Sequence, residues 1–255
     1  MRIIVLISGG KDSTATLLKA LDYQNKHSNI DVIPVFCDTK WESELTYQYL
    51  EYLENKLKID IIKISNDKYP NGLPDLIRKF KRFPFIKSRF CTNELKTKPL
   101  KQFLKDINAT SKDTEIWLGV RLDENIYRRI RYGRHLTDKQ CKLYEVFRNF
   151  PKCFWDIGIK MPILDWTANK VFDYISNHGI KPNPLYNHFD RVGCFPCLLS
   201  GKTYFKKCML YPDGVKHLKI LLELEDEIGK KVSPYFSVKK IIESHIYQKN
   251  IDEYI

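Results

Sequence analysis

The stretch Ser8-Gly9-Gly10-Lys11-Asp12-Ser13 lies between an apolar run, residues 3–7, and a segment with the apolar spacing of a helix, residues 12–25. Glycines allow a tight turn and a close approach of the backbone to a ligand. The N–H groups at a helix start are unpaired and lie at the positive end of the helix dipole, so they attract an anion. Lys11 adds positive charge, and Ser8 and Ser13 add hydroxyl donors. We therefore predict a phosphate-binding loop here rather than an ordinary strand-to-helix turn.

Apolar runs and helical spacings alternate along the first half of the chain. They predict strands at residues 3–7, 32–36, 59–64 and 115–119, and helices at residues 12–25 and 42–58. This alternation favours an α/β fold, in which a parallel twisted sheet carries helices on both faces. Ligands of such sheets bind beyond the carboxyl ends of the strands. Because Ser8, Asp38 and Gly119 follow three of these strands, we expect one cleft to collect them.

The rest of the chain is less regular. Residues 66–90 contain three prolines and are interpreted as loop, and residues 121–160 are basic and aromatic without a clear pattern. Helical spacing returns after Tyr204, at residues 215–227 and 238–247. We predict a nucleotide-binding domain at residues 1–200 and a helical C-terminal appendage at residues 201–255.

Composition limits the class of protein. The chain is 43% hydrophobic and 29% charged, which is typical of a globular protein. It has no apolar run near the roughly 20 residues of a membrane span and no visible signal peptide, so we expect a cytoplasmic protein without a membrane partner. A net charge of +12 fits a polyanionic partner, such as nucleic acid, or equally a solvated lysine-rich surface.

Four of the seven cysteines form a pattern. Cys194 and Cys197 make a C-x-x-C pair, Cys208 follows, and Cys91 lies far upstream. Four thiolates suit an iron–sulfur cluster or structural zinc, whereas the pair alone would also suit a redox dithiol. We favour a metal centre. Cys37, at a strand end, is interpreted as a small buried hydrophobe rather than a sulfur-carrying thiol.

The loop at residues 8–13 is not the common P-loop, because Val5 and Asp12 stand where that motif needs Gly and Ser or Thr. It resembles the signature of the PP-loop ATP pyrophosphatases. Members of that superfamily cleave ATP between the α- and β-phosphates or bind a related adenylyl compound. The resemblance implies that residues 8–13 hold the phosphates of an adenine nucleotide, with Mg²⁺ bridging them.

Residues 1 to about 200 resemble one branch of that superfamily, the phosphoadenosine phosphosulfate reductase family. Residues 35–39 are similar to its second-strand motif, which implies that Asp38 and Thr39 lie beside the adenosine. Gly119-Val120-Arg121 and Arg128 are similar to a segment whose arginines meet the anionic end of the substrate. The stretches 162–167, 171–180 and 183–194 continue the likeness in register.

The sequence also departs from the reductases. It has no Cys after Cys208, where thioredoxin-dependent reductases carry a nucleophilic Cys near the C-terminus, and Lys40 replaces the Gly usual after Asp-Thr. A single cysteine in Arg89-Phe90-Cys91-Thr92, followed by the three later cysteines, resembles the sulfur-activating protein of bacterial DNA phosphorothioation. That resemblance implies ATP as substrate and a 4Fe–4S cluster.

We therefore predict an enzyme that cleaves ATP at the α,β bond, adenylates an acceptor and transfers sulfur through a cluster. A nucleic acid, DNA or tRNA, and a sulfur donor such as a cysteine desulfurase are the expected partners. The alternatives are a sulfonucleotide reductase, a sulfate adenylyltransferase-type subunit, a non-enzymatic nucleotide binder, and structural zinc in place of the cluster. The expected catalytic residues are Lys11, Asp12, Lys96, Arg121 and Arg128; the nucleotide-binding residues are Ser8, Gly9, Gly10, Lys11, Asp12, Ser13, Asp38, Thr39 and Gly119; the cluster ligands are Cys91, Cys194, Cys197 and Cys208.

Overall fold

The computed structural model describes residues 1–147 and 149–244. The chain divides into two compact units that interleave along the sequence. The first comprises Met1–Cys37, Leu45–Ile64 and Pro99–Tyr186, and the second comprises Asp38–Glu44, Ser65–Lys98 and Asn187–Ile255. The predicted domain boundary near residue 200 stays a prediction.

The first unit contains a six-stranded sheet with the order β3-β2-β1-β4-β6-β5. All neighbours are parallel except β5, which pairs antiparallel with β6. Ile7 is opposite Phe36 and Leu6 is opposite Leu118, so three neighbouring strands end at the same edge. This arrangement confirms the predicted α/β fold. The strands are β1 (Arg2–Ile7), β2 (Asp31–Cys37), β3 (Ile62–Ile64), β4 (Thr114–Leu118), β5 (Gln140–Lys142) and β6 (Gly158–Lys160).

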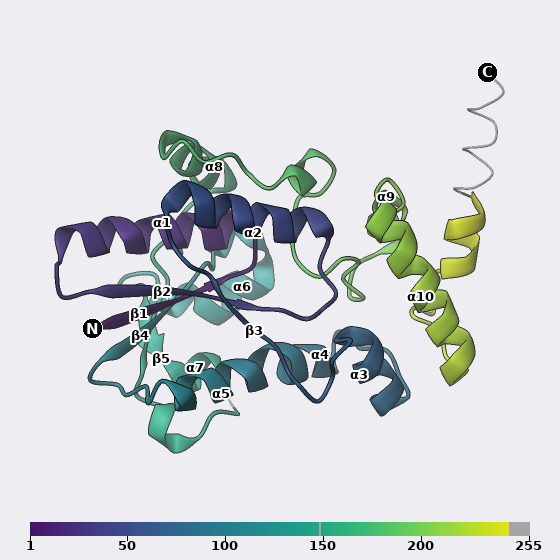
Figure 1. Ribbon diagram of the computed structural model, residues 1–255, viewed down its shortest axis with the longest axis horizontal. Coiled ribbons are helices and arrows are strands. Elements are labelled where there is room, and N and C mark those ends of the chain that lie inside the picture. Colours follow the sequence, from purple (N-terminus) through teal and green to yellow (C-terminus); the bar gives the residue numbers. More distant parts are fainter. Residues whose placement is uncertain (148, 245–255) are drawn as a thin grey trace. The chain divides into compact units, whose positions relative to one another are not determined.

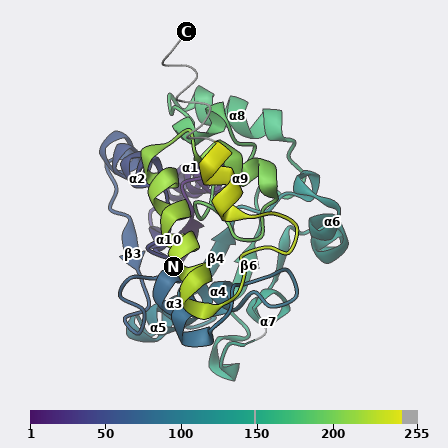
Figure 2. The same ribbon diagram turned by 90° about the vertical axis from the view of Figure 1, so that its right-hand side faces the viewer.

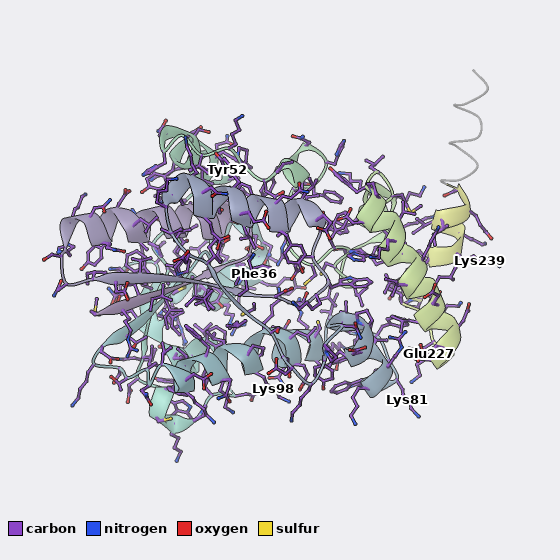
Figure 3. All side chains as sticks on the ribbon, viewed as in Figure 1. Phe36, Tyr52, Lys81, Lys98, Glu227 and Lys239 are labelled. Atoms are coloured by element: carbon purple, nitrogen blue, oxygen red, sulfur yellow. The ribbon has the colours of Figure 1, made fainter. Side chains whose placement is uncertain are left out.

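Helices cover both faces of this sheet (Figure 1). Along β1, Ile3, Val5 and Ile7 belong to the core under one helical layer, whereas Ile4 belongs to the core under the other. Phe36 of β2 lies in the first core, and Tyr52 of the covering helix packs against that core (Figure 3). The first layer is α1 (Lys11–Lys26), α2 (Glu44–Leu57) and α8 (Ala168–Asn177); the second is α5 (Lys98–Asp106), α6 (Ile126–Tyr132) and α7 (Leu143–Val146).

The segment predicted as a third strand, residues 59–64, is shorter than expected. Only its last three residues pair with β2. The amide of Ile59 donates to the Glu54 carbonyl at 3.2 Å, and the amide of Ile61 donates to Glu54 Oε1 at 2.9 Å. These amides follow the end of α2 and bond back to it, and the Ile61 side chain is buried in the core. The apolar spacing therefore reflected burial more than strand pairing.

The interpretation of residues 66–90 as loop is wrong for α3 (Leu73–Phe80). Pro74 lies in the first turn of this helix, where a missing N–H removes no helical hydrogen bond. Four short helical turns connect other elements of the first unit: η2 (Leu122–Glu124), η3 (Gly133–His135), η4 (Lys152–Phe154) and η5 (Pro184–Asn187), the last ending one residue into the second unit.

The described part of the second unit is helical. It contains α3, α4 (Phe90–Thr92), a π-helical turn η1 (Asn93–Thr97), α9 (Lys202–Cys208), α10 (Pro212–Ile228) and a helical stretch at 238–244. Figure 2 shows α9 and α10 side by side. Arg78 of α3 pairs with Glu227 of α10 at 2.8 Å, and the Lys230 ammonium donates to the Lys81 carbonyl at 3.0 Å (Figure 3).

These helices confirm the predicted helical C-terminal segment. The end of the helix expected at 238–247 lies outside the described residues. Within residues 1–147 and 149–244, no helix combines the length and the apolar character that a membrane crossing requires.

Candidate active site

The loop between β1 and α1 requires glycine at its first turn. Gly9 has φ +70°, and a Cβ added there would lie 2.7 Å from Thr46 Cγ2. The Asn183 amide donates to the Gly9 carbonyl at 3.1 Å. Ser13 Oγ donates to the Gly10 carbonyl at 2.9 Å and accepts from the Ser8 amide at 3.1 Å. A local side chain, Ser13, and a distant one, Asn183, thus fix the shape of the loop.

Helix α1 begins at Lys11, and its N-cap residue, Gly10, provides no side-chain acceptor. A helix that starts in this way presents first-turn amides and a positive dipole end to an anion. One of these amides is already bonded, because Lys11 N donates to the Tyr186 hydroxyl at 2.8 Å. The loop therefore has the geometry of the predicted phosphate site, with Tyr186 at its border.

Lys11 is held by aromatic rings. Its side chain is 7% exposed, and its ammonium lies 4.9 Å from the Tyr186 ring centroid and 5.6 Å from that of Phe172. The same ammonium lies 3.9 Å from a carboxylate oxygen of Asp12. Cation–π contacts of this kind orient a lysine without neutralising it. The predicted site residues do not include Phe172, Asn183 or Tyr186, although all three lie in stretches with a family resemblance.

Arg121 is buried and positions Asp12. Its Nε donates to Asp12 Oδ1 at 2.6 Å, and its Nη1 donates to Asp123 Oδ2 at 3.1 Å. The guanidinium also lies 3.4 Å from the Trp166 carbonyl. Two carboxylates thus balance the charge of Arg121, and its direct contact with an anionic substrate stays a prediction.

Arg128 lies on α6, where its Nε pairs with Glu124 at 3.3 Å. The helix starts at Asn125, whose side chain accepts from the Arg128 amide. The Arg128 side chain is 32% exposed, so its guanidinium is partly accessible to solvent. Its role at the anionic end of a substrate also stays a prediction.

Gly119 brings the end of β4 against the first turn of α1. A Cβ there would lie 2.6 Å from the Asp12 carbonyl carbon and 2.7 Å from the Ser13 amide nitrogen. We expect Gly119→Ala to lower the free energy of unfolding by about 1–3 kcal/mol and to weaken nucleotide binding, because the helix start must shift. Denaturant unfolding and calorimetry with ATP would measure both effects.

Gly158→Ala is the matched control in the same sheet, since its added Cβ would meet Glu115 Cγ at an ordinary 3.6 Å. Equal stability and equal ATP affinity in the two alanine variants would contradict the assigned role of Gly119.

The second unit begins with the segment that follows β2. Asp38 is buried, pairs with the Lys40 ammonium at 2.7 Å and accepts from the Lys40 amide at 2.8 Å. Lys40 has φ +54°, a conformation that glycine adopts most easily, which accounts for the Gly usual at this position in the family. Ser8 and Gly119 belong to the first unit and Asp38 to the second, so their common cleft stays a prediction.

Three of the four predicted cluster ligands line one cavity of about 280 Å³ within the second unit. Cys91 comes from α4, and Cys194 and Cys197 come from the segment before α9. Cys208, at the end of α9, is fully buried, and Cys197 lies close enough to influence its pKa. The lining also includes Thr39, Lys96, Arg191 and Tyr204.

The spacing of these thiols bears on the choice between zinc and a cluster. Zn–S bonds of about 2.3 Å place the sulfurs of a tetrahedral site about 3.8 Å apart. Among the described residues, no three of these thiol sulfurs lie within 4.8 Å of one another. The cavity of about 280 Å³ has room for a polynuclear group. Four thiols around this cavity suit an iron–sulfur cluster or, if they move closer together, a zinc ion.

Burial controls the protonation of these thiols. It raises the pKa of Cys194 to about 12, with a further contribution from Glu42, and it raises the pKa values of Cys91 and Cys208. Lys96, on the π-helical turn η1, counteracts this shift at both Cys91 and Cys194. Because metal ligation requires thiolates, binding of a cluster would release protons and be favoured at higher pH.

Glu42 is a buried carboxyl group beside this cavity's Thr39. The Thr39 hydroxyl donates to Glu42 Oε1 at 2.8 Å and lies 3.9 Å from Cys194 Sγ, whereas Glu42 Oε2 is buried without a hydrogen-bond partner. Burial raises the pKa of Glu42 above its ordinary value of 4.5. No pattern in the sequence marks this group, because its burial depends on the fold.

The raised pKa predicts a pH-dependent stability. A carboxyl group of this kind stabilises the fold fully below its unfolded pKa, near 4.5, and this contribution is lost as pH rises through the folded pKa. We expect Glu42→Gln to remove that decline in the free energy of unfolding, measured by urea unfolding of metal-free protein from pH 4.5 upward. The exposed Glu44, changed to Gln, is the control. An unchanged pH slope in Glu42→Gln would contradict the assignment.

The sheet order and the loop geometry define an α/β protein of the PP-loop class. The Phosphoadenosine phosphosulfate reductase domain family matches residues 2–200 of the chain. The chain therefore belongs to the phosphoadenosine phosphosulfate reductase domain family, which confirms the resemblance seen in the sequence.

Two relatives illustrate this membership. A protein of Escherichia phage 186, named an uncharacterized 37.8 kDa protein in the gpa 5′ region, is 31% identical over 245 residues, covering 78% of this chain and 68% of the phage protein. The phosphoadenosine 5′-phosphosulfate reductase of Synechocystis is 25% identical over 161 residues, covering 62% of this chain. The chain spans 55% of the length of that reductase.

Solved structures share the fold at low identity. The phosphoadenylyl-sulfate reductase of Candida auris, in a phosphate complex, has a TM-score of 0.52 and 12% identity, covering 76% of this chain and 82% of its own. The U34-tRNA thiolase NcsA of Methanococcus maripaludis, with its [4Fe-4S] cluster, has a TM-score of 0.51 and 15% identity, covering 100% of this chain and 73% of its own.

Proposed function

We propose that this protein cleaves ATP between the α- and β-phosphates, adenylates an oxygen of an acceptor, and then replaces that oxygen with sulfur. The observation that carries the proposal is the loop at residues 8–13. Its helix start, its glycine turn and its buried lysine suit the phosphate chain of a nucleotide. In this proposal, the four candidate cluster cysteines in the second unit bind and transfer the sulfur.

The first step is a displacement at phosphorus. An acceptor oxygen attacks the α-phosphorus, the bond from that phosphorus to the bridging oxygen breaks, and pyrophosphate leaves with the electron pair. The acceptor proton passes to solvent or to a neighbouring base. The first-turn amides of α1 and the Lys11 ammonium stabilise the charge that develops on the leaving pyrophosphate. Arg121 orients the Asp12 carboxylate, whose negative charge would interact with the Mg²⁺ of a Mg²⁺–ATP complex.

The second step uses the cysteine cavity. Cys91, Cys194, Cys197 and Cys208 would hold the iron–sulfur cluster, which supplies a site for binding or transferring sulfur. A sulfur nucleophile then displaces AMP from the activated acceptor carbon, so that one C–O bond breaks as one C–S bond forms. If the acceptor is instead a phosphate oxygen, a P–S bond replaces a P–O bond. Lys96 and Arg191 line this cavity and keep it attractive to an anionic sulfur species.

The test compares two products. Anaerobically purified protein is supplied with ATP and either duplex DNA or bulk tRNA. A cysteine desulfurase with cysteine is the sulfur source, and a dithiol reductant releases its persulfide sulfur as sulfide. We expect release of AMP and pyrophosphate, with thiolated nucleic acid detected by mass spectrometry after digestion. The same protein with adenylyl sulfates and a thiol reductant should release no sulfite. Sulfite release without any pyrophosphate from ATP would overturn the proposal.

That opposite result would favour the second candidate, a sulfonucleotide reductase. Family membership supports this alternative, as does a cavity in which cysteines and cationic side chains lie together.

Helix α6 supports a nucleic-acid partner. It exposes Ile126, Tyr127 and Ile130 by 59%, 80% and 75%, and Arg129 and Arg131 are exposed on the same short helix. Exposed aromatic rings stack on unpaired bases, and arginines bind phosphates. The net charge of +12 acts in the same direction. We propose that α6 contacts the acceptor nucleic acid.

Removing one arginine tests this contact. Arg129→Gln should weaken binding of a single-stranded oligonucleotide and reduce the salt dependence of log K by about 1. Tyr127→Ala should weaken the same binding by about 1–3 kcal/mol through lost stacking. Fluorescence anisotropy at several salt concentrations measures both. Lys219→Gln, on the exposed surface of α10, removes the same charge elsewhere. Equal losses in Arg129→Gln and Lys219→Gln would show that only net charge matters.

A further inference from the structure

Three metal-ligating side chains converge at the edge of the sheet in the first unit, away from the cysteine cavity in sequence. His135 comes from η3, Cys141 from β5 and Glu145 from α7. Their ligand atoms all lie within 4.8 Å of one another, and His135 Nε2 lies 3.7 Å from Glu145 Oε2. All three residues are partly buried. The resemblance to a known family gave none of them a role.

A cationic side chain, Arg134, already bonds two of these three ligand atoms. The Arg134 guanidinium donates from Nε to His135 Nε2 at 3.0 Å and from Nη2 to Glu145 Oε2 at 2.8 Å. His135 Nε2 therefore acts as an acceptor, which is the form of imidazole that binds a metal. Glu145 Oε1 is used separately, because it accepts from the Lys142 amide at 2.8 Å, and Oε2 remains for the cation.

Arg134 can leave this position without disturbing the core. Its side chain is 66% exposed, whereas those of His135 and Glu145 are 12% and 20% exposed. A cavity of about 440 Å³ adjoins the cluster and is lined by Arg131, Arg134, His135 and Glu145 among others. The guanidinium is thus far more exposed to solvent than the two donors that it contacts.

We propose that His135, Cys141 and Glu145 form a zinc site, in which Zn²⁺ takes the place of the Arg134 guanidinium. One nitrogen, one sulfur and one carboxylate oxygen suit this borderline metal, with water as the fourth ligand. Ideal zinc bonds to nitrogen and oxygen place those two ligand atoms about 3.4 Å apart, close to the observed 3.7 Å. Binding converts the Cys141 thiol to a bound thiolate and releases its proton.

Such a site would tie η3, β5 and α7 together at the one antiparallel edge of the described sheet. Cys141 also packs against the core, so its side chain could serve the fold alone. A measurement of bound metal distinguishes that structural role from zinc binding. The outcome does not depend on the proposed adenylation, because no nucleotide or turnover enters the measurement.

The experiment is zinc titration of the full chain against a competing chromophoric chelator, with zinc content measured after gel filtration. Wild type should bind one more equivalent of zinc than either Cys141→Ser or His135→Gln. Adding zinc should also raise the Tm of wild type by more than it raises the Tm of either variant. Arg134→Gln should bind this zinc about two- to fivefold more tightly, the factor expected from losing one exposed ion pair. Cobalt in place of zinc should give a thiolate absorption band that weakens in Cys141→Ser.

Equal zinc stoichiometry and affinity in wild type, Cys141→Ser and His135→Gln would overturn the proposal, since all bound zinc would then belong to the other cysteines. If Cys141→Ser unfolds, His135→Gln decides alone, because His135 is not part of the hydrophobic core. Weaker binding in Arg134→Gln would also contradict the site, because it would make Arg134 a supporting group rather than a competitor.

Discussion

Lys11→Met is expected to lower the rate of pyrophosphate release from ATP by about two to three orders of magnitude, the usual cost of removing one preorganised donor from a developing charge. Methionine keeps an unbranched apolar stem and removes only the ammonium that lies over the Tyr186 and Phe172 rings, so the fold should survive. Because the charge acts on the leaving pyrophosphate, the loss should fall mainly on kcat. Steady-state kinetics with a coupled pyrophosphate assay would measure it.

Lys26→Met is the matched control, since Lys26 lies in the last turn of the same helix. It removes the same charge from α1 at the opposite end from the loop and should leave turnover unchanged. Comparable losses in the two variants would show that the charge of the helix matters, rather than the position of Lys11. Wild-type turnover in Lys11→Met would end the assignment of the loop.

Cys194→Ser is expected to reduce the iron and sulfide content of anaerobically purified protein to near zero and to bleach its visible absorption. Cys194 contributes a partly buried thiol to the cavity that Cys91 and Cys197 also line. Serine is a poor ligand for iron, and the three remaining thiols cannot complete the set. Iron and sulfide analysis with electron paramagnetic resonance would measure the loss.

Cys153→Ser is the matched control, because Cys153 is an exposed free cysteine outside that cavity. Its iron content should equal that of wild type. If wild-type protein contained one zinc and no iron, the proposed cluster would be wrong and these thiols would hold zinc instead. If Cys194→Ser kept its iron, Cys194 would leave the ligand set.

Local patterns in the sequence predicted the loop well. The run from Ile3 to Ser13 contains a strand, a glycine turn and a helix start in contiguous residues, and each depends on neighbours in the chain. The alternation of strands and helices then predicted the parallel sheet, because βαβ units allow few topologies. The four candidate cluster cysteines could be proposed from a pattern, and three of them share a cavity; their role as ligands stays a prediction.

Contacts between distant segments could not be predicted in the same way. Tyr186 caps the Lys11 amide across 175 residues of sequence, and Arg121 reaches Asp12 across 109. Composition shows neither contact. Glu42 reads as an ordinary surface acid in a helical segment, and only the fold shows that it is buried. Helix α3 was missed because its proline sits at the helix start, where proline is tolerated.

The central claim is that the loop at residues 8–13 binds the phosphates of an adenine nucleotide. A crystal structure of the anaerobic protein with Mg²⁺ and the α,β-methylene analogue of ATP tests it most directly, because the analogue cannot be cleaved at the proposed bond. We predict that its β- and γ-phosphates lie within hydrogen-bond distance of the amides of residues 9–13 and of the Lys11 ammonium. A well-ordered nucleotide bound elsewhere, with this loop unchanged and without phosphate, would contradict the account.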